Sequence, residues 1–266
     1  MAVDHIAVAE FYSGAFTGIV TGNAGVPVPS CPGWTVDDLV AHLAEVQSWW
    51  TLVLPARGGV PDDEVARRAA DPGPDRVGGW REISARYLAA QRECPPDAPV
   101  WVWWNDEERA TAADVASRQA HEAVVHCWDA GNAVGRPEPI PAELAADGVG
   151  EFLDRFLHGP EWVRGPLVVE LVATDTGDRW LVGAEGAGGV GGGAGGVAGA
   201  GGVSGAAGVA GAGKPRRVVA GEPGARVSGT AEQLYLVLWR RAAREEVTVT
   251  GDEAGVEALL AWPRLD

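Results

Sequence analysis

The sequence contains one glutamate and two histidines whose types and spacing could bind a metal ion. Glu122 and His126 lie four residues apart in a segment without Gly or Pro. On an α-helix this spacing places both side chains on one face, one turn apart. Together with His42, which falls in a separate predicted helix, they would offer a divalent metal three protein ligands. Three ligands leave a coordination position open, which is typical of catalytic rather than structural metal sites.

Each of these residues also has an ordinary structural interpretation. His42 fits a histidine at the edge of an apolar core, and Glu122 with His126 fits a hydrogen-bonded pair on a helix surface. Two observations favour the metal. Histidine is scarce, with five in 266 residues, and Glu122 lies in a segment rich in Ala and Val, where an unpaired carboxylate would be costly.

The other three histidines do not extend this group. His121 and His126 are five residues apart, about 140° around a helix, so the two cannot hold one ion and the zinc-protease pattern is not met. We expect His121 to pack against the helix or to support a ligand. His5 and His158 have no neighbours at ligand spacing, and we expect neither to bind a metal.

Aromatic residues and one arginine are candidates for contact with a small molecule. The chain has 12 tryptophans, clustered at Trp49-Trp50 and again between Trp101 and Trp104. Core packing is the default interpretation. The alternative is an aromatic-walled pocket beside the metal, with Trp50 as a substrate-binding residue. Arg118 lies one turn before the glutamate and is a second substrate-binding candidate, for an anion or a carboxylate, unless it is a plain helix-surface arginine.

Four helical segments are expected in the first half of the chain. The second begins cleanly, with Thr35 as an N-cap and Asp37 and Asp38 in the first turn. Residues at three- and four-residue spacing then form an apolar stripe, which His42 borders. The four segments cover about residues 4–20, 35–50, 75–92 and 112–133. They predict an antiparallel four-helix bundle over residues 1–136, whose core is a natural place for a metal.

The second half, residues 141–266, predicts a small α+β domain. We expect strands at 167–173 and 179–182. The Asp-Thr-Gly-Asp turn at 175–178 between them indicates a β-hairpin. Further expected elements are helices at 142–157, 230–240 and 252–260, strand pairing within 218–227, and a strand at 247–249. The segment of about residues 184–214 consists almost wholly of Gly, Ala and Val. Because such a segment cannot bury enough apolar surface to offset the entropy lost on ordering, we expect a disordered insertion there without function.

Composition excludes several classes of partner. The formal net charge of −16 argues against nucleic acid and anionic membranes, which favour clusters of Lys and Arg. No apolar run approaches twenty residues and the first residues lack a basic region, so we expect a cytoplasmic protein. The three cysteines, Cys31, Cys94 and Cys127, are expected to be reduced thiols, and none is an obvious nucleophile.

Two motifs resemble those of a known family. The segment CPGWTVDDLVAHL at residues 31–43 and the segment RQAHEAVVHCWDA at residues 118–130 resemble helix motifs of the mycothiol-dependent maleylpyruvate isomerase family. The segments VATDTGDRW at 172–180, GTAEQL at 229–234 and LWRR at 238–241 resemble its C-terminal domain. The resemblance covers nearly the whole chain except residues 186–213. It implies a DinB-like metal-binding bundle followed by a small α/β domain of sterol-carrier-like shape.

The resemblance also implies ligands, cofactors and an activity. His42, Glu122 and His126 match the family's metal ligands, and Zn²⁺ is the expected ion, although the donor set also suits nickel, iron or manganese. The metal would stabilise the thiolate of mycothiol, which explains the lack of a catalytic cysteine. As a cis-trans isomerase the enzyme would add this thiolate to a double bond and release it again. As a thiol S-transferase it would leave the sulfur attached to a small electrophile.

One arginine and two alternative functions remain open at this point. Arg241 matches an arginine that the family places facing the cleft, where it would hold a substrate carboxylate and serve catalysis. Arg240 stands where the family commonly has Gly, so which of the two faces the cleft is undecided. The alternatives to the thiol enzyme are a non-catalytic metal-binding or regulatory module and a metal-dependent hydrolase with water in the open position. Oligomeric state and physiological substrate are not readable.

Overall fold

The computed structural model describes residues 3–104, 110–184 and 214–265. Contacts divide the chain into two compact units, residues 1–151 and 152–266. Nearly all of the predicted insertion at 184–214 lies outside the described residues. Within the described residues no helix is both long and apolar enough to cross a membrane.

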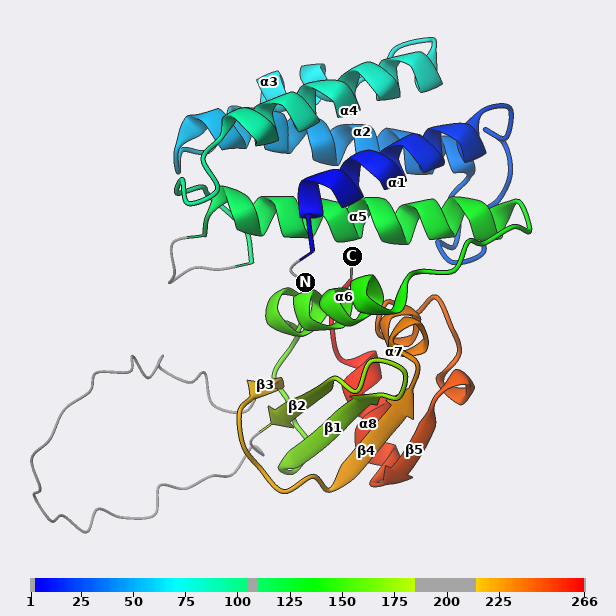
Figure 1. The fold of residues 1–266 in the computed structure, drawn as a ribbon, viewed down its shortest axis with the longest axis vertical. Helices are drawn as coiled ribbons and strands as arrows, with labels where there is room; N and C mark the ends of the chain where they lie inside the picture. The colour runs from blue at the N-terminus through cyan, green and yellow to red at the C-terminus, as the bar shows by residue number, and fades with distance from the viewer. Residues whose placement is uncertain (1–2, 105–109, 185–213, 266) are drawn as a thin grey trace, which may run out of the picture. The chain divides into compact units, whose positions relative to one another are not determined.

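The N-terminal unit is helical, as predicted (Figure 1). Its long helices are α1 (His5–Val20), α2 (Val36–Val53), α4 (Arg76–Glu93) and α5 (Ala112–Ala133), and α6 (Ala142–Arg155) begins within it. A short 3₁₀ helix, η1 (Leu54–Ala56), follows α2. The helical bundle and the α+β class are therefore confirmed.

The prediction of four helices before residue 134 missed a short one, α3 (Asp63–Ala70). This helix has only 8 residues and is mostly polar: Val65 is 53% exposed and Ala66 is its buried residue. Asp62 starts the helix by accepting hydrogen bonds from the backbone N–H groups of Glu64 and Val65. A helix this short and polar offers few apolar residues to a search for hydrophobic periodicity, which explains why the sequence pattern did not reveal it.

Capping boxes position the two helices that carry the candidate ligands. Thr35 and Asp38 exchange side-chain and backbone hydrogen bonds at the start of α2, and Thr111 and Asp114 do the same for α5. Each box satisfies backbone donors that a helix start otherwise leaves unpaired. α5 is buried over most of its length and packs along α1, with its small alanines allowing close approach.

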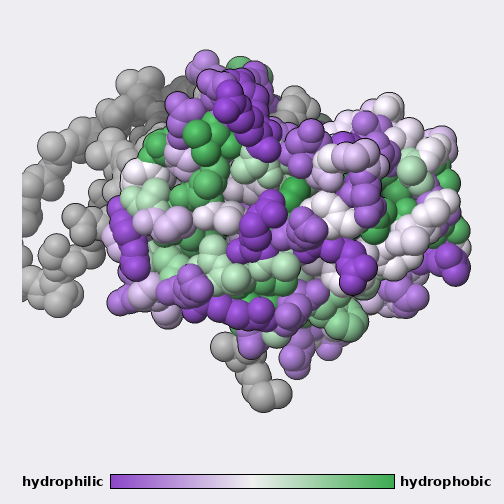
Figure 2. All heavy atoms as spheres, turned by 90° about the horizontal axis from the view of Figure 1, so that it is seen from above, coloured by the Kyte–Doolittle hydropathy of each residue, from purple (hydrophilic) through white to green (hydrophobic). Residues whose placement is uncertain are grey.

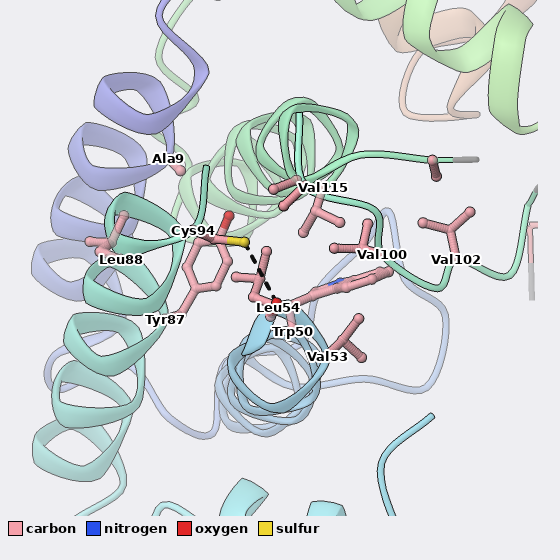
Figure 3. Packing of buried hydrophobic residues seen from close by; sticks show 13 residues of the cluster. Ala9, Trp50, Val53, Leu54, Tyr87, Leu88, Cys94, Val100, Val102 and Val115 are labelled. Carbon is pink, nitrogen blue, oxygen red and sulfur yellow. Dashed lines mark hydrogen bonds between the residues drawn. The ribbon is translucent and has the colours of Figure 1, made fainter. Parts of the chain in front are cut away.

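Two apolar clusters flank the polar middle of α5. One contains Trp50 from the end of α2, Leu54 from η1, Tyr87 from α4 and Val115 from the start of α5 (Figure 3). The other contains residues from the start of α2 and Ala130 near the end of α5. The polar residues of α5 lie between these two packed regions, which hold the helices in place around them.

The C-terminal unit is built on a five-stranded sheet of order β3-β2-β1-β4-β5. Its strands are β1 (Leu167–Ala173), β2 (Arg179–Ala184), β3 (Arg216–Val218), β4 (Ala225–Gly229) and β5 (Thr248–Gly251). The predicted hairpin is confirmed, with Val169 opposite Val182 in an antiparallel pair. The region expected to add strand pairing at 218–227 forms two strands: β3 pairs with β2, and β4 runs parallel to β1.

Two helices cover this sheet. They are α7 (Ala231–Leu238) and α8 (Glu253–Ala261), and a short 3₁₀ helix, η2 (Arg244–Glu246), precedes β5. Alternate residues of β1 are buried, as expected for a strand with one covered face. Val169 and Leu171 of β1 line a small apolar space with Leu238 and Val256 of the helices.

The surface view shows hydrophilic side chains interspersed with apolar ones (Figure 2).

Candidate metal centre

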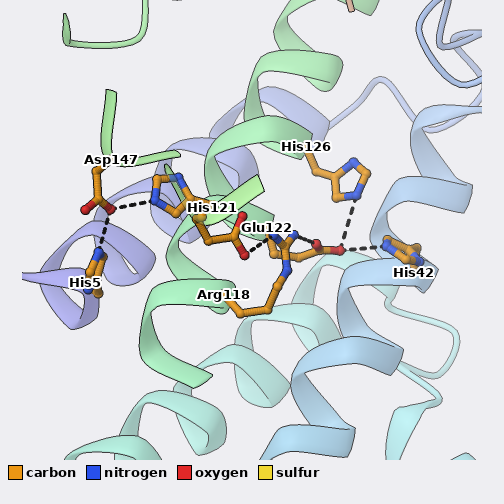
Figure 4. Close-up of polar contacts among 8 residues, drawn as sticks. His5, His42, Arg118, His121, Glu122, His126 and Asp147 are labelled. Atoms are coloured by element: carbon orange, nitrogen blue, oxygen red, sulfur yellow. Dashed lines mark hydrogen bonds and ion pairs between the residues drawn. The ribbon is translucent and has the colours of Figure 1, made fainter. Parts of the chain in front are cut away.

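The three residues predicted as ligands come together in the bundle (Figure 4). His42 Nε2 lies 2.8 Å from Glu122 Oε1, and His126 Nε2 lies 3.3 Å from the same oxygen. The ligand atoms of all three lie within 4.8 Å of one another. A tetrahedral zinc site places its ligands about 3.4 Å apart. Small side-chain shifts would therefore admit an ion at this point.

Electrostatics keep Glu122 ready to bind a cation. Its other oxygen, Oε2, pairs with the Arg118 guanidinium, which also binds Glu151 at 2.8 Å. Burial would raise the pKa of Glu122, but the Arg118 charge and hydrogen bonds with His126 and His42 hold that pKa well below its usual range. Glu122 is therefore ionised and can act as a ligand to a divalent cation.

Asp129 fixes the orientation of His126, and the sequence interpretation assigned it no role. His126 Nδ1 lies 2.9 Å from Asp129 Oδ2, and Asp129 is fully buried. The Ser30 hydroxyl donates to the other carboxylate oxygen at 2.6 Å, and Cys31 Sγ lies 3.6 Å from Oδ2. Burial opposes the charged imidazole, but hydrogen bonds with Asp129 and Glu122 raise the pKa of His126.

This arrangement is the one that metal-binding histidines usually have, with the second ring nitrogen held by a carboxylate. It leaves His126 Nε2 directed at the ligand group. The i,i+3 spacing of His126 and Asp129 on a helix was a signal that could have revealed the pair. The donor set and its supporting contacts therefore fit a divalent metal.

A cavity of about 520 Å³ opens beside His42. Trp49, Trp50 and Trp103 form aromatic walls, and Glu45 and Arg67 add charged groups. Trp50, predicted as a substrate-binding residue, thus lies on the same cavity as a candidate ligand. The helix α3 that the sequence did not reveal supplies Arg67 to this wall.

The other predicted site residues have different surroundings. Arg118 is 3% exposed and is therefore not a helix-surface arginine. In the C-terminal unit, Arg240 donates to the backbone carbonyl groups of Ala261 and Pro263, at 3.0 and 2.6 Å. Arg241 donates to the carbonyl of Trp239 at 2.8 Å. The predicted roles of Arg118 in substrate binding and of Arg241 in catalysis stay predictions.

Comparison with family models shows to which protein family the chain belongs. Residues 16–131 match the family model described as the mycothiol maleylpyruvate isomerase N-terminal domain, and residues 143–258 match the C-terminal domain of the same family. The chain belongs to the mycothiol-dependent maleylpyruvate isomerase family. The resemblance indicated by the motifs is thus confirmed, and the first matched segment of this family member contains all three candidate ligands. No curated protein matches the sequence of the chain.

Solved structures show the same fold for this member of the maleylpyruvate isomerase family. The chain is similar to a crystal structure of the mycothiol-dependent maleylpyruvate isomerase, with a TM-score of 0.55 and 16% identity over 95% of this chain and 92% of the other. A crystal structure of a histidine-to-alanine mutant of that isomerase gives a TM-score of 0.54 and 14% identity over the same shares. At these identities the likeness concerns the fold.

Proposed function

We propose that this chain is a metal-dependent enzyme that uses mycothiol, with a divalent ion held by His42, Glu122 and His126. The observation that carries the proposal is the meeting of three ligand atoms within 4.8 Å beside a cavity of about 520 Å³. Zinc suits this set of two imidazoles and one carboxylate. A bound zinc ion supplies a Lewis acid that stabilises a thiolate at neutral pH.

The protein's own residues prepare that chemistry. Arg118 keeps Glu122 ionised, and Asp129 keeps Nε2 of His126 directed inward. Because the guanidinium of Arg118 contacts Glu122 and Glu151, we assign it a positioning role in preference to direct contact with substrate. Burial raises the pKa of the Cys127 thiol to about 12, so this cysteine does not compete as a nucleophile.

The cavity would receive the small molecules. Trp49, Trp50 and Trp103 offer flat apolar surface to mycothiol or to the electrophile. We expect Trp49→Ala to raise KM several-fold with a smaller change in kcat, because Trp49 is half-buried on the cavity wall and its loss removes packing and no reacting group. Arg241 remains our candidate for holding a substrate carboxylate.

Two reactions are compatible with this site. In an isomerisation the sulfur of mycothiol bonds to one alkene carbon while the π electrons move onto an adjacent electron-withdrawing group of the substrate. After rotation about the resulting single bond these electrons return, the double bond re-forms, and the carbon–sulfur bond breaks to release the thiolate and the trans product. In an S-transfer to the same type of electrophile, the neighbouring carbon takes up a proton instead and the carbon–sulfur bond persists. Mass spectrometry of mycothiol after turnover separates the two, because the isomerase returns it unchanged and the transferase converts it to a thioether.

The first test is metal content followed by calorimetry with mycothiol. We expect stoichiometric metal at the His42, Glu122 and His126 group and mycothiol binding that disappears in His42→Ala. His158→Ala is the matched control, because His158 lies in the C-terminal unit outside this group. Metal without mycothiol affinity would favour the hydrolase instead. Failure of this group to bind metal would favour a non-catalytic module.

A further inference from the structure

A second group of metal-binding side chains lies on the other side of α5 from Glu122 (Figure 4). It consists of His5 from α1, His121 from α5 and Asp147 from α6, which we call the His5 cluster. His5 Nε2 lies 2.7 Å from Asp147 Oδ2, and His121 Nε2 lies 2.8 Å from the same oxygen. The ligand atoms of the three residues all lie within 4.8 Å of one another.

The geometry of the His5 cluster matches that of the first centre. In both, two imidazole Nε2 atoms converge on one carboxylate oxygen, and the nitrogen–oxygen distances are 2.7 and 2.8 Å here against 2.8 and 3.3 Å there. Tetrahedral coordination needs ligand separations of about 3.4 Å. Each nitrogen–oxygen pair of the His5 cluster must therefore widen by roughly 0.6–0.7 Å to hold an ion.

Two of the three side chains are partly exposed and have room to move apart by this distance. The side chain of His121 is fully buried, whereas those of His5 and Asp147 are 24% and 33% exposed. One ligand is thus held by packing, and two lie at an edge that water and a metal ion can reach. The exposed edge also leaves room for a water as a further ligand, since three protein ligands do not complete the coordination of zinc.

The charge of Asp147 suits a cation. Burial would raise its pKa, but hydrogen bonds with His121 and His5 lower that pKa below its ordinary value. Asp147 is therefore ionised at neutral pH. Two imidazoles and an ionised carboxylate form a donor set that binds zinc and other divalent transition metals.

We propose that His5, His121 and Asp147 form a second divalent-metal site, separate from the centre at His42. The ion would join three helices whose ligands lie 142 and 26 residues apart in sequence. Its ligands come from the start of α1, the middle of α5 and α6. Bound there, the ion would cross-link α1 and α6 to the central helix of the bundle.

Metal stoichiometry tests the site on the full-length chain. After removal of metal, the protein is titrated with Zn²⁺, separated from free ion and analysed for zinc. We expect two zinc ions per chain in the wild type, one in His5→Ala, one in His42→Ala and none in the double variant. His158→Ala should retain both. His121 is left intact because it adjoins Glu122.

Asp147→Asn provides a second variant, because it keeps the size and an oxygen acceptor while removing the charge. It should also bind one zinc ion. In the His42→Ala background, zinc at 100 times its Kd should raise Tm by about 5–10 °C. Adding Asp147→Asn to that background should abolish the shift.

The outcomes separate this site from the proposed function. A wild type with one zinc ion, lost in His42→Ala and retained in both His5→Ala and Asp147→Asn, would overturn the second site and leave the proposed function standing. Zinc that is lost in His5→Ala but retained in His42→Ala would support the second site and contradict the first. Two ions with the expected losses support both.

Discussion

Replacing Arg118 by methionine should destabilise the chain strongly. The side chains of Arg118, Glu122 and Glu151 are 4%, 12% and 2% exposed. Methionine retains much of the apolar stem but removes the guanidinium that both carboxylates contact. Two buried carboxylates would then each lose the guanidinium that they contact.

The expected loss is about 3–5 kcal/mol in the free energy of unfolding of the metal-free protein, the range for removing one partner of a buried ion pair. Adding Glu151→Gln should recover part of this loss, because it removes one of the two stranded charges. Zinc at 100 times its Kd for this centre should stabilise the variant by about 2.7 kcal/mol, because the ion binds the folded protein.

Urea unfolding of the metal-free variants, followed by circular dichroism, measures this loss. Arg68→Met is the matched control, because Arg68 and Glu64 form an ion pair with the same i,i+4 spacing but are 79% and 66% exposed. Its stability should change by no more than about 0.5 kcal/mol. If Arg118→Met costs less than about 1 kcal/mol, the pair behaves as a surface pair and the reasoning fails.

Three further results are expected. His126→Ala should lose at least nine-tenths of the metal bound at the first centre while retaining its helicity by circular dichroism; full retention of that metal would contradict the ligand assignment. Hydrogen bonds from Arg179 and Arg226 lower the pKa of Glu170 in the folded protein. The stability that this carboxylate contributes is therefore present above its pKa in the unfolded chain and is lost as the pH falls through its pKa in the folded protein. Glu170→Gln should therefore cost about 0.5–1 kcal/mol at pH 7 and progressively less as the pH is lowered through the folded-state pKa, as urea unfolding over a series of pH values would show; a loss independent of pH would refute this. Alkylation with iodoacetamide should modify Cys31, which is partly exposed, well before buried Cys127, whose pKa is raised to about 12; equal rates by mass spectrometry would show that burial does not protect it.

Local signals made much of the fold predictable. The cap at Thr35 and the apolar spacing after it place α2 within a few residues. The turn before Arg179 likewise indicates the β1–β2 hairpin. These features depend on residues close together in sequence, so their physical causes can be read from a single chain.

Contacts between distant residues were not readable in the same way. Nothing near His5 indicates Asp147, its partner 142 residues away. The burial of Arg118 depends on Glu151, which lies 33 residues later on another helix. Packing of whole helices creates both contacts, whereas Glu122 and His126 were found because one helix turn brings them together.

The parallel pairing of β1 with β4 has a similar cause. The residues that pair are Val169 with Ala225 through Ala173 with Gly229, across a long stretch of intervening chain. A parallel pair has no turn signal of its own, because its strands are joined by a crossover instead of a hairpin. The sequence pattern therefore indicated a strand region there but not its division into β3 and β4.

The central claim is that the ion at His42, Glu122 and His126 binds the sulfur of mycothiol. The most direct measurement is the absorption spectrum of the Co²⁺-substituted full-length chain during titration with mycothiol. We predict a sulfur-to-cobalt charge-transfer band that saturates at one mycothiol per chain and is missing in His42→Ala. A spectrum that mycothiol leaves unchanged, in protein with cobalt bound at this centre, would contradict the account.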